Sequence, residues 1–309
     1  MEFRQIRYFR VVAEAGSFTR AAHELGISQP SLSKQIRQLE AQLDAVLLIR
    51  DGRGVKMTAA GAELYDRLVE VDEKLKDAKS AVARIGASVN TISIGATGLV
   101  GTEFLTDMVE AIATRYPQSE VRLVEGYSEQ IAAWLHSGRL DIALLYGGKA
   151  SQQAEELLFI AQDLYLVTAA TAAPSAQGPI DFAQLVDQPL IAFDQPSRLR
   201  ARFERAAETV GVSLEFRHAI DSFAVIKEMV ARGEGVIGLP FSAVAAEVQA
   251  DRLHTRPING PQMQLGLKLM ASRRSGLGRE IYDYCDLLRA LLTERCDTGQ
   301  WEGCWIASE

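Results

Sequence analysis

Long apolar runs are missing from this sequence of 309 residues. No stretch approaches the about eighteen consecutive apolar residues that a membrane-spanning helix needs. The N-terminal segment MEFRQIRYFR carries charges where a secretory signal peptide has an apolar core. The sequence therefore predicts a cytoplasmic protein with no membrane partner.

Cysteine is scarce and confined to the C-terminal end of the chain. The three cysteines are Cys285, Cys296 and Cys304. Their spacing fits no metal site, and any disulfide scheme leaves one of them unpaired. We predict three free thiols, which is the usual state in a reducing compartment.

Catalytic motifs are also absent. The four histidines, His23, His136, His218 and His254, lie far apart in the sequence. There is no HExxH pattern, no GxSxG nucleophile turn and no phosphate-binding GxxxxGK loop. Gly95, Gly98 and Gly101 lack the spacing of a dinucleotide fingerprint. These absences argue against an enzyme, a metal site and a cofactor.

The net charge of −7 is distributed unevenly along the chain. Residues 1–58 contain nine Lys and Arg against six Asp and Glu, which leaves −10 on the remaining 251 residues. A small basic module beside a larger acidic body is compatible with a local nucleic-acid contact that the overall charge conceals.

The segment AAHELGISQPSLSKQIRQLE keeps a helical apolar spacing on both sides of Gly26 and Pro30. Ser17 is predicted to cap a helix over residues 18–25, which Gly26 ends in the left-handed conformation. Ser28 is predicted to cap a second helix with Pro30 in its first turn. The apolar stripe of this second helix consists of Leu32, Ile36 and Leu39. The pattern predicts a helix-turn-helix.

The opposite face of the second helix is short, polar and basic near its N-terminus. It consists of Gln29, Ser31, Ser33, Lys34 and Arg37. Such residues suit the edges of bases in the DNA major groove, although an ordinary solvated face is the alternative. Two short apolar runs, 47–49 and 55–57, then flank a turn and predict a hairpin. Arg50 and Arg53 project from it and suit a minor groove or phosphates.

The first 61 residues resemble the DNA-binding domain of LysR-type transcriptional regulators. The resemblance rests on three features in this order: SFTRAAHELGISQPSLSKQIRQLEAQL, the hairpin and TAAG. The resemblance implies a winged helix-turn-helix over residues 1–58 that binds double-stranded DNA sequence-specifically. The predicted DNA contacts are Ser17, Thr19, Ser28, Gln29, Pro30, Ser31, Ser33, Lys34, Arg37, Arg50 and Arg53. Two departures, Val46 in place of a common proline and Leu48 in place of a common phenylalanine, alter packing more than chemistry.

Residues 59–87 predict one long helix with an apolar seam at steps of four and three. The seam consists of Leu64, Leu68, Val71, Leu75, Ala78, Val82 and Ile85. It predicts a linker helix that pairs two chains in a homodimer; packing against the body of the same chain is the alternative. Two symmetric modules should read an inverted-repeat operator. Family members usually assemble further, so the resemblance leaves dimer and tetramer open.

Residues 88–296 alternate short β-rich runs with helical segments, which is typical of parallel α/β architecture. With SGRLDIALL and GEGVIGLP they resemble the bilobal, periplasmic-binding-protein-like effector domain of the same family. Lobe I is predicted at about 88–163 and 266–296, and lobe II at about 164–265. A solute-binding protein or transferase of this form is the rival interpretation, but it would not need the first 86 residues.

Ligands of such folds bind beyond the carboxyl ends of the strands, at helix N-termini. The predicted effector-binding residues at these corners are Thr97, Gly98, Thr102, Ser128, Phe193, Asp194, Gln195, Ser197, Arg198 and Ser222. Their hydroxyls are equally suited to be helix caps. Backbone amides there favour a carboxylate-bearing metabolite, whereas Asp194 leaves room for a cationic group such as that of an amino acid. Arg198 is predicted either to pair with Asp194 or to clamp a carboxylate.

The tail 297–309 contains Trp301 and Trp305, and the sequence leaves open whether it packs on the body, mediates assembly or is disordered. For the whole chain we predict a transcriptional regulator in which effector binding changes lobe closure, the dimer arrangement and hence the spacing of the DNA-reading modules.

Overall fold

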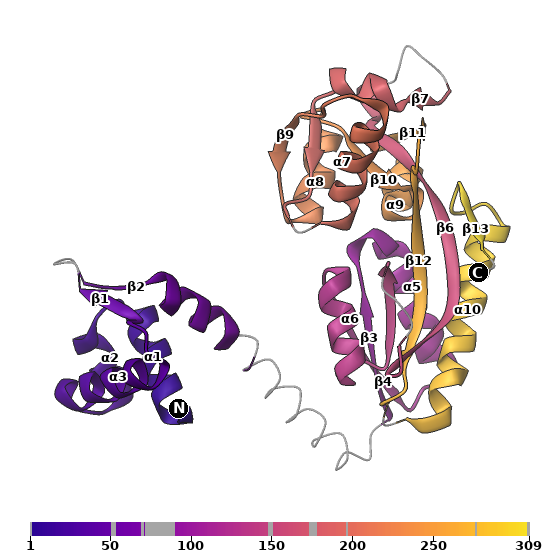
Figure 1. Cartoon of the computed structure of the whole chain (residues 1–309). Helices are drawn as coiled ribbons and strands as arrows, with labels where there is room; N and C mark the ends of the chain where they lie inside the picture. Colours follow the sequence, from indigo (N-terminus) through magenta and orange to yellow (C-terminus); the bar gives the residue numbers. More distant parts are fainter. Residues whose placement is uncertain are drawn as a thin grey trace. The chain divides into compact units, whose positions relative to one another are not determined.

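The computed structural model describes residues 2–50, 54–68, 71, 90–147, 151–172, 178–195, 197–275 and 277–307. The chain divides into two compact units, Met1–Val82 and Ala83–Glu309, and each is described by itself (Figure 1).

The first unit includes the helices α1 (Phe3–Ala15), α2 (Phe18–Leu25) and α3 (Gln29–Leu43) and a hairpin of β1 (Leu48–Arg50) and β2 (Val55–Met57). The Ser17 hydroxyl accepts the Arg20 N–H at 3.4 Å, and Gly26 ends α2 at φ 67°. The Ser28 hydroxyl accepts the Ser31 N–H at 3.4 Å at the start of α3. The predicted bounds of α2 and the predicted caps Ser17, Gly26 and Ser28 are confirmed.

The core of this unit forms where the apolar stripe of α3 meets α1. Leu32, Ile36 and Leu39 are buried with Phe9 and Val12. Strands β1 and β2 pair antiparallel, as the hairpin pattern predicts. Burial of this stripe fixes the opposite face of α3 toward the outside.

Residues 59–68 are helical, and the Thr58 hydroxyl accepts the Gly61 N–H at 3.0 Å at the start of this segment. Leu68 is only 4% exposed within the core of the first unit, and Leu64 packs against that core. Both leucines therefore pack within their own chain, whereas Val71 is 40% exposed. The predicted seam residues Leu75, Ala78, Val82 and Ile85 lie outside the described residues.

The second unit has two lobes. Lobe I contains β3 (Asn90–Ala96), η1 (Gly98–Val100), α5 (Thr102–Arg115), β4 (Ser119–Glu125), α6 (Ser128–Ser137), β5 (Ile142–Tyr146), β12 (Gln264–Ser272), η5 (Gly278–Glu280), α10 (Ile281–Asp297) and β13 (Cys304–Ile306). Strands β4, β3 and β5 pair parallel, but β12 pairs antiparallel with β5. The expected parallel sheet is thus mixed, because β12 returns from lobe II in the opposite direction.

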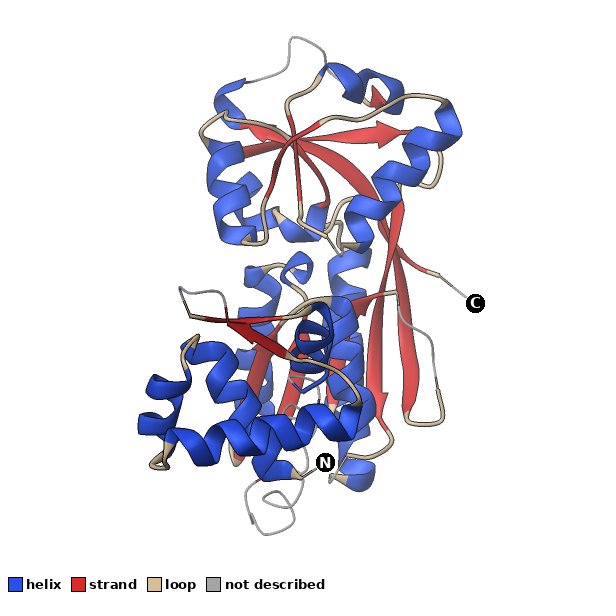
Figure 2. Ribbon diagram, turned by 60° about the vertical axis from the view of Figure 1, so that its left-hand side comes forward, coloured by secondary structure: helices blue, strands red, loops and turns tan. Residues whose placement is uncertain are grey.

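Helices cover both faces of the lobe I sheet (Figure 2). Strand β5 is buried throughout, so its alternate side chains face two cores. Ala143 and Leu145 pack on the side of α6, whereas Ile142 and Leu144 pack in the core that α5 and α10 share. This sandwich holds the carboxyl ends of β3, β4 and β5 at one edge.

Strand β6 (Ala154–Ala169) passes from one lobe into the other (Figure 1). Its first part pairs with β12 up to Asp163, and its second part, from Leu164, pairs with β10 and β11. The other elements of lobe II are η2 (Ala170–Ala172), β7 (Ile180–Asp181), η3 (Phe182–Asp187), β8 (Leu190–Ala192), α7 (Arg198–Val210), β9 (Phe216–Ala219), α8 (Phe223–Ala231), β10 (Ile237–Pro240), η4 (Phe241–Ala243), α9 (Ala245–Gln249) and β11 (Leu253–Asn259).

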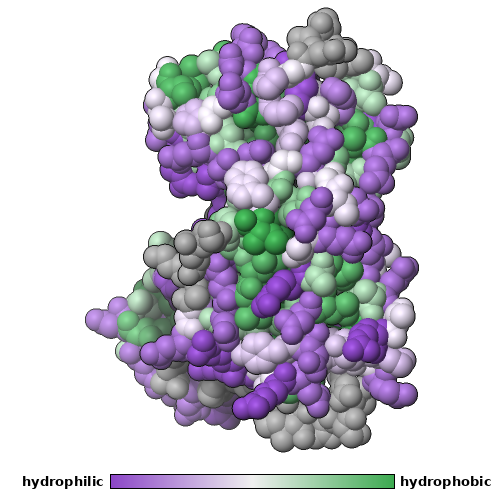
Figure 3. Space-filling model, turned by 90° about the vertical axis from the view of Figure 1, so that its right-hand side faces the viewer, coloured by the Kyte–Doolittle hydropathy of each residue, from purple (hydrophilic) through white to green (hydrophobic). Residues whose placement is uncertain are grey.

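The C-terminal tail packs on the body. Trp301 is buried with its ring 5.2 Å from that of Phe104, and β13 pairs with β6 at Ile160–Gln162. Trp305 and Ile306 of β13 stay exposed. Hydrophobic side chains gather on part of the face that Figure 3 turns to the viewer. Of the three outcomes left open for the tail, the structure shows packing.

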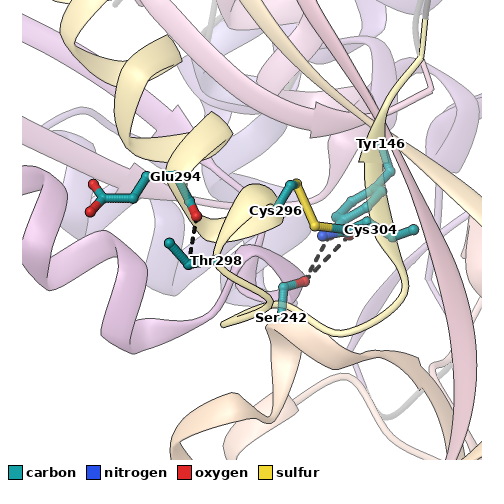
Figure 4. The surroundings of a disulfide bond; sticks show 7 residues. Tyr146, Ser242, Glu294, Cys296, Thr298 and Cys304 are labelled. Carbon is teal, nitrogen blue, oxygen red and sulfur yellow. Dashed lines mark hydrogen bonds between the residues drawn. A yellow bond between two sulfur atoms is a disulfide. The ribbon is translucent and has the colours of Figure 1, made fainter.

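The prediction of three free thiols is wrong for two of them. Cys296, at the end of α10, and Cys304, in β13, form a disulfide (Figure 4). They meet because the chain turns back after α10 and lays β13 beside β6, a return that spacing alone did not reveal. The remaining thiol, Cys285, is free and buried in α10.

Candidate functional site

The outer face of α3 presents the residues predicted to read DNA. Gln29, Pro30, Ser31, Lys34 and Arg37 are exposed, and Ser33 is half-buried. These residues lie in the N-terminal half of α3, beyond the turn that Gly26 makes. The arrangement leaves short polar and basic groups free to enter a groove.

The other predicted DNA contacts have mixed positions. Thr19 is exposed in the first turn of α2, while the hydroxyls of Ser17 and Ser28 are engaged as helix caps. Arg50 ends β1. Arg53 lies outside the described residues.

A cavity of about 360 Å³ lies between the two lobes of the second unit. Its walls come from the carboxyl ends of β3, β4 and β5 in lobe I and from the segments after β8 and β9 in lobe II. Six of the predicted effector residues line it, namely Thr97, Gly98, Ser128, Phe193, Ser197 and Arg198. The rule that ligands bind at strand ends therefore locates the cavity.

Four predicted effector residues are absent from the cavity wall. Thr102 is the first residue of α5, and Ser222 caps α8 by accepting the Val225 N–H at 3.4 Å. Asp194 accepts the Gln195 N–H at 2.9 Å, and both residues are exposed. For Ser222 the structure thus shows the helix-capping alternative.

Two side-chain contacts bridge the lobes at the cavity. Arg198 of α7 pairs with Glu129 of α6 and not with Asp194. The Tyr127 hydroxyl, just before α6, donates to the Asp221 carboxylate, which follows β9. Burial and the nearby Asp221 carboxylate raise the pKa of Tyr127 to about 12, so the phenol stays a donor at neutral pH.

Beneath these bridges, a buried polar cluster joins the lobes. The Tyr146 hydroxyl donates to Gln162 Oε1 at 2.7 Å, and the Ser242 hydroxyl donates to the Leu99 carbonyl at 3.0 Å. Tyr146 and Leu99 belong to lobe I, Ser242 belongs to lobe II, and Gln162 lies on β6 near its crossing. Burial raises the pKa of Tyr146. Figure 4 shows Tyr146 and Ser242 close to the disulfide.

Thr97 has the only cavity-lining hydroxyl among the described residues that is buried without a hydrogen-bond partner. The residue is 6% exposed and directly follows β3. Buried hydroxyls are usually hydrogen-bonded, so this oxygen is suited to a polar ligand atom.

Sequence reasoning missed the acids of the wall and, apart from Phe193, its aromatic residues. Glu125, Tyr127, Asp221 and Phe223 line the cavity together with the predicted residues. Each lies at one of the strand-to-helix corners already singled out, so the same rule applied to carboxylates and rings as well as to hydroxyls would have found them.

Within the described residues, His, Cys, Asp and Glu side chains nowhere gather in threes that could hold a metal ion. The same part of the chain contains no helix both long and apolar enough to span a membrane.

A helix-turn-helix with an exposed polar face and a bilobal unit with an interlobe cavity define a DNA-binding regulator that also binds a small molecule. Residues 3–62 match the family model "Bacterial regulatory helix-turn-helix protein, lysR family", and residues 86–293 match "LysR substrate binding domain". The chain therefore belongs to the LysR family of transcriptional regulators.

Among characterised relatives, the nitrogen assimilation regulatory protein nac of Klebsiella aerogenes is 29% identical over 95% of this chain and 96% of that protein. The DNA-binding transcriptional dual regulator OxyR of Escherichia coli is 27% identical, with 96% and 98% covered. A crystal structure of full-length CbnR complexed with target DNA has a TM-score of 0.57 at 23% identity, over 94% of this chain and 100% of that one. This last likeness shows a shared fold.

Proposed function

We propose that this regulator is a cytoplasmic homodimer without enzymatic activity that binds an inverted-repeat operator and responds to a carboxylate-bearing metabolite. The proposed division of labour assigns DNA reading to residues 1–58, dimerisation to 59–87 and effector binding to 88–296. The DNA contacts are those on α2, α3 and the hairpin.

The observation that carries the proposal is the interlobe cavity bridged by Glu129–Arg198 and Tyr127–Asp221. These partners come from different lobes, so a ligand that competes for them changes how the lobes are held together. A ligand shifts an equilibrium only through a difference in its affinity for two states. A ligand that contacts both lobes has different affinities for the two arrangements of the lobes.

The first turn of α6 supports a carboxylate on the effector. Ser128, Glu129 and Gln130 line the cavity at the helix N-terminus, where backbone N–H groups have no intrahelical acceptor. These amides and the positive end of the helix dipole attract an anion. Arg198 stands opposite and can exchange Glu129 for a ligand carboxylate.

The exposed Val71 supports the homodimer, because it continues the apolar seam beyond the two leucines that pack inward. An exposed valine within a helical seam gains free energy when a second helix covers it. Two chains joined in this way present two equivalent α3 helices, and their symmetry favours an inverted repeat.

The test is fluorescence anisotropy of the full chain on its operator with and without a metabolite fraction. We expect the fraction to change DNA affinity for the native protein and for Thr106→Val, an exposed control on α5. Thr97→Val should abolish that change while leaving DNA affinity without metabolite intact. A metabolite effect that is equal in both variants would refute the role of the cavity.

A further inference from the structure

The charged residues of the interlobe cavity are mostly acidic. Among the described residues, its wall carries three carboxylates, Glu125, Glu129 and Asp221, and one guanidinium, that of Arg198. Because Arg198 pairs with Glu129, the described part of the wall has no further cation to neutralise the other two carboxylates. A ligand with negative charge alone would meet repulsion from them.

Glu125 is the acid best placed to meet a ligand. It ends β4, is exposed, and its carboxylate makes no hydrogen bond or ion pair with the described residues. Asp221, by comparison, already accepts the Tyr127 hydroxyl. Among the described residues, Glu125 therefore has the one carboxylate of the wall without a partner.

Aromatic rings accompany this carboxylate. A Cβ on Gly98 would lie 2.8 Å from Glu125 Oε1 and 3.2 Å from Phe223 Cδ1, so acid and ring border the same point. The rings of Phe223 and Phe193 are 5.8 Å apart, and both line the cavity. Carboxylates beside aromatic faces attract organic cations.

Thr97 supplies an independent indication of a ligand. It lies next to Gly98, is 94% buried, and its hydroxyl has no partner among the described residues although the residue lines the cavity. A hydroxyl oxygen accepts from an ammonium group, which brings only donors.

We propose that the effector carries a protonated amine, which Glu125 binds at Gly98 beside the ring of Phe223. This inference rests on the proposed function and adds a chemical class to it. With the carboxylate assigned to the first turn of α6, the effector class is that of amino acids and related amino carboxylates. Diamines also carry an ammonium group, and the titration experiment below distinguishes them from amino carboxylates.

The test is isothermal titration calorimetry of the full chain with three matched series of probes. Putrescine and cadaverine carry ammonium at both ends, γ-aminobutyrate and δ-aminovalerate carry one ammonium and one carboxylate, and succinate and glutarate carry only carboxylates. We expect the amino carboxylates to bind best. Glu125→Gln, which keeps the shape of the side chain, should weaken their binding by roughly tenfold or more.

Glu120→Gln is the matched control, because Glu120 lies at the other end of the same strand and outside the cavity. It should leave every affinity unchanged, and Phe223→Leu should weaken only the ammonium-bearing probes. If the diamines bind best, the proposed ammonium group is supported but the amino-carboxylate class is overturned.

The ammonium proposal is overturned if no ammonium-bearing probe binds, or if Glu125→Gln binds them as the native chain does. The ammonium proposal is also overturned if only the dicarboxylates bind. If Thr97→Val then abolishes their binding, the cavity remains the effector site. An ammonium group that does not bind at Glu125 is thus distinguished from a cavity that does not bind the effector.

Discussion

Single residues on the outer face of α3 should separate base reading from phosphate binding. Gln29 and Ser33 carry hydrogen-bonding groups without charge at its N-terminal half, whereas the arginines of the hairpin carry charge. Hydrogen bonds to base edges specify sequence, and cations on phosphates act on every sequence alike. The two kinds of substitution should therefore have different signatures.

Gln29→Ala should relax base preference, at a cost of ~1–3 kcal/mol for a lost bidentate contact on the preferred sequence, and Ser33→Ala, which removes a single hydroxyl, should relax it less. Arg53→Ala should instead weaken binding evenly and reduce the slope of log affinity against log salt by about 1. Anisotropy titrations over a salt series measure both effects. Equal losses on all sequences for all three variants would contradict the assignment.

The cysteines give a prediction on thiol reactivity. Burial raises the pKa of the Cys285 thiol to about 12, so at about pH 8 it is protonated and unreactive. Cys296 and Cys304 are protected by their disulfide. Iodoacetamide should label no cysteine in the native chain, Cys285 alone after denaturation, and all three after denaturation with reductant. Labelling of Cys304 in the native, unreduced protein, detected by mass spectrometry, would show that the bond is not formed.

Which site residues could be foreseen depended on how local their determinants are. Thr97, Gly98 and Ser128 follow strands within their own segment of sequence, so a rule about strand ends finds them. The pairing of Arg198 with Glu129 joins residues of two lobes, and no local pattern encodes it. The same holds for the contact of Ser242 with Leu99.

At the scale of elements, the helices were predictable where caps and stripes agree. Helix α2 runs from Phe18 to Leu25 between the predicted caps Ser17 and Gly26, and the predicted apolar stripe of α3 is buried, because these signals lie within each helix's own segment of sequence. The disulfide and strand β13 were not predictable, since they depend on the chain turning back onto β6.

In the helical segment after Thr58, Leu68 packs in the core of the first unit, whereas Val71 is exposed and is proposed to contact the second chain. Leu68→Ala should destabilise the first unit by ~2–5 kcal/mol, because it opens a cavity in that unit's core. Val71→Asp should leave the fold of the unit intact and shift the chain from dimer to monomer, because a carboxylate cannot be covered by a partner helix without cost. Urea unfolding followed by circular dichroism and sedimentation velocity separate the two outcomes. A Val71→Asp chain that remains dimeric would place the interface elsewhere.

The whole chain combines a DNA-reading unit with a ligand-sensing unit. The Glu129–Arg198 pair is half exposed on both sides, so breaking it should change the free energy of unfolding by less than about 1 kcal/mol. Its weakness suits a contact that a ligand must displace. Linkage requires that an effector which changes DNA affinity has its own affinity changed by DNA in the same proportion.

Arg198→Gln should therefore leave the melting temperature nearly unchanged while reducing the effect of the metabolite on DNA binding. The comparison variant is Arg232→Gln, whose arginine forms an exposed pair with Glu228 within lobe II. Thermal unfolding and anisotropy measure the two quantities. A metabolite response that survives Arg198→Gln undiminished would remove this pair from the coupling.

The most direct test of the central claim is selection of bound DNA from a random pool by the purified full chain, followed by sequencing. The account predicts an enriched inverted repeat whose half-sites fit two α3 helices of one dimer. Enrichment of a single asymmetric site, or no enrichment at moderate salt with the metabolite fraction present, would contradict it.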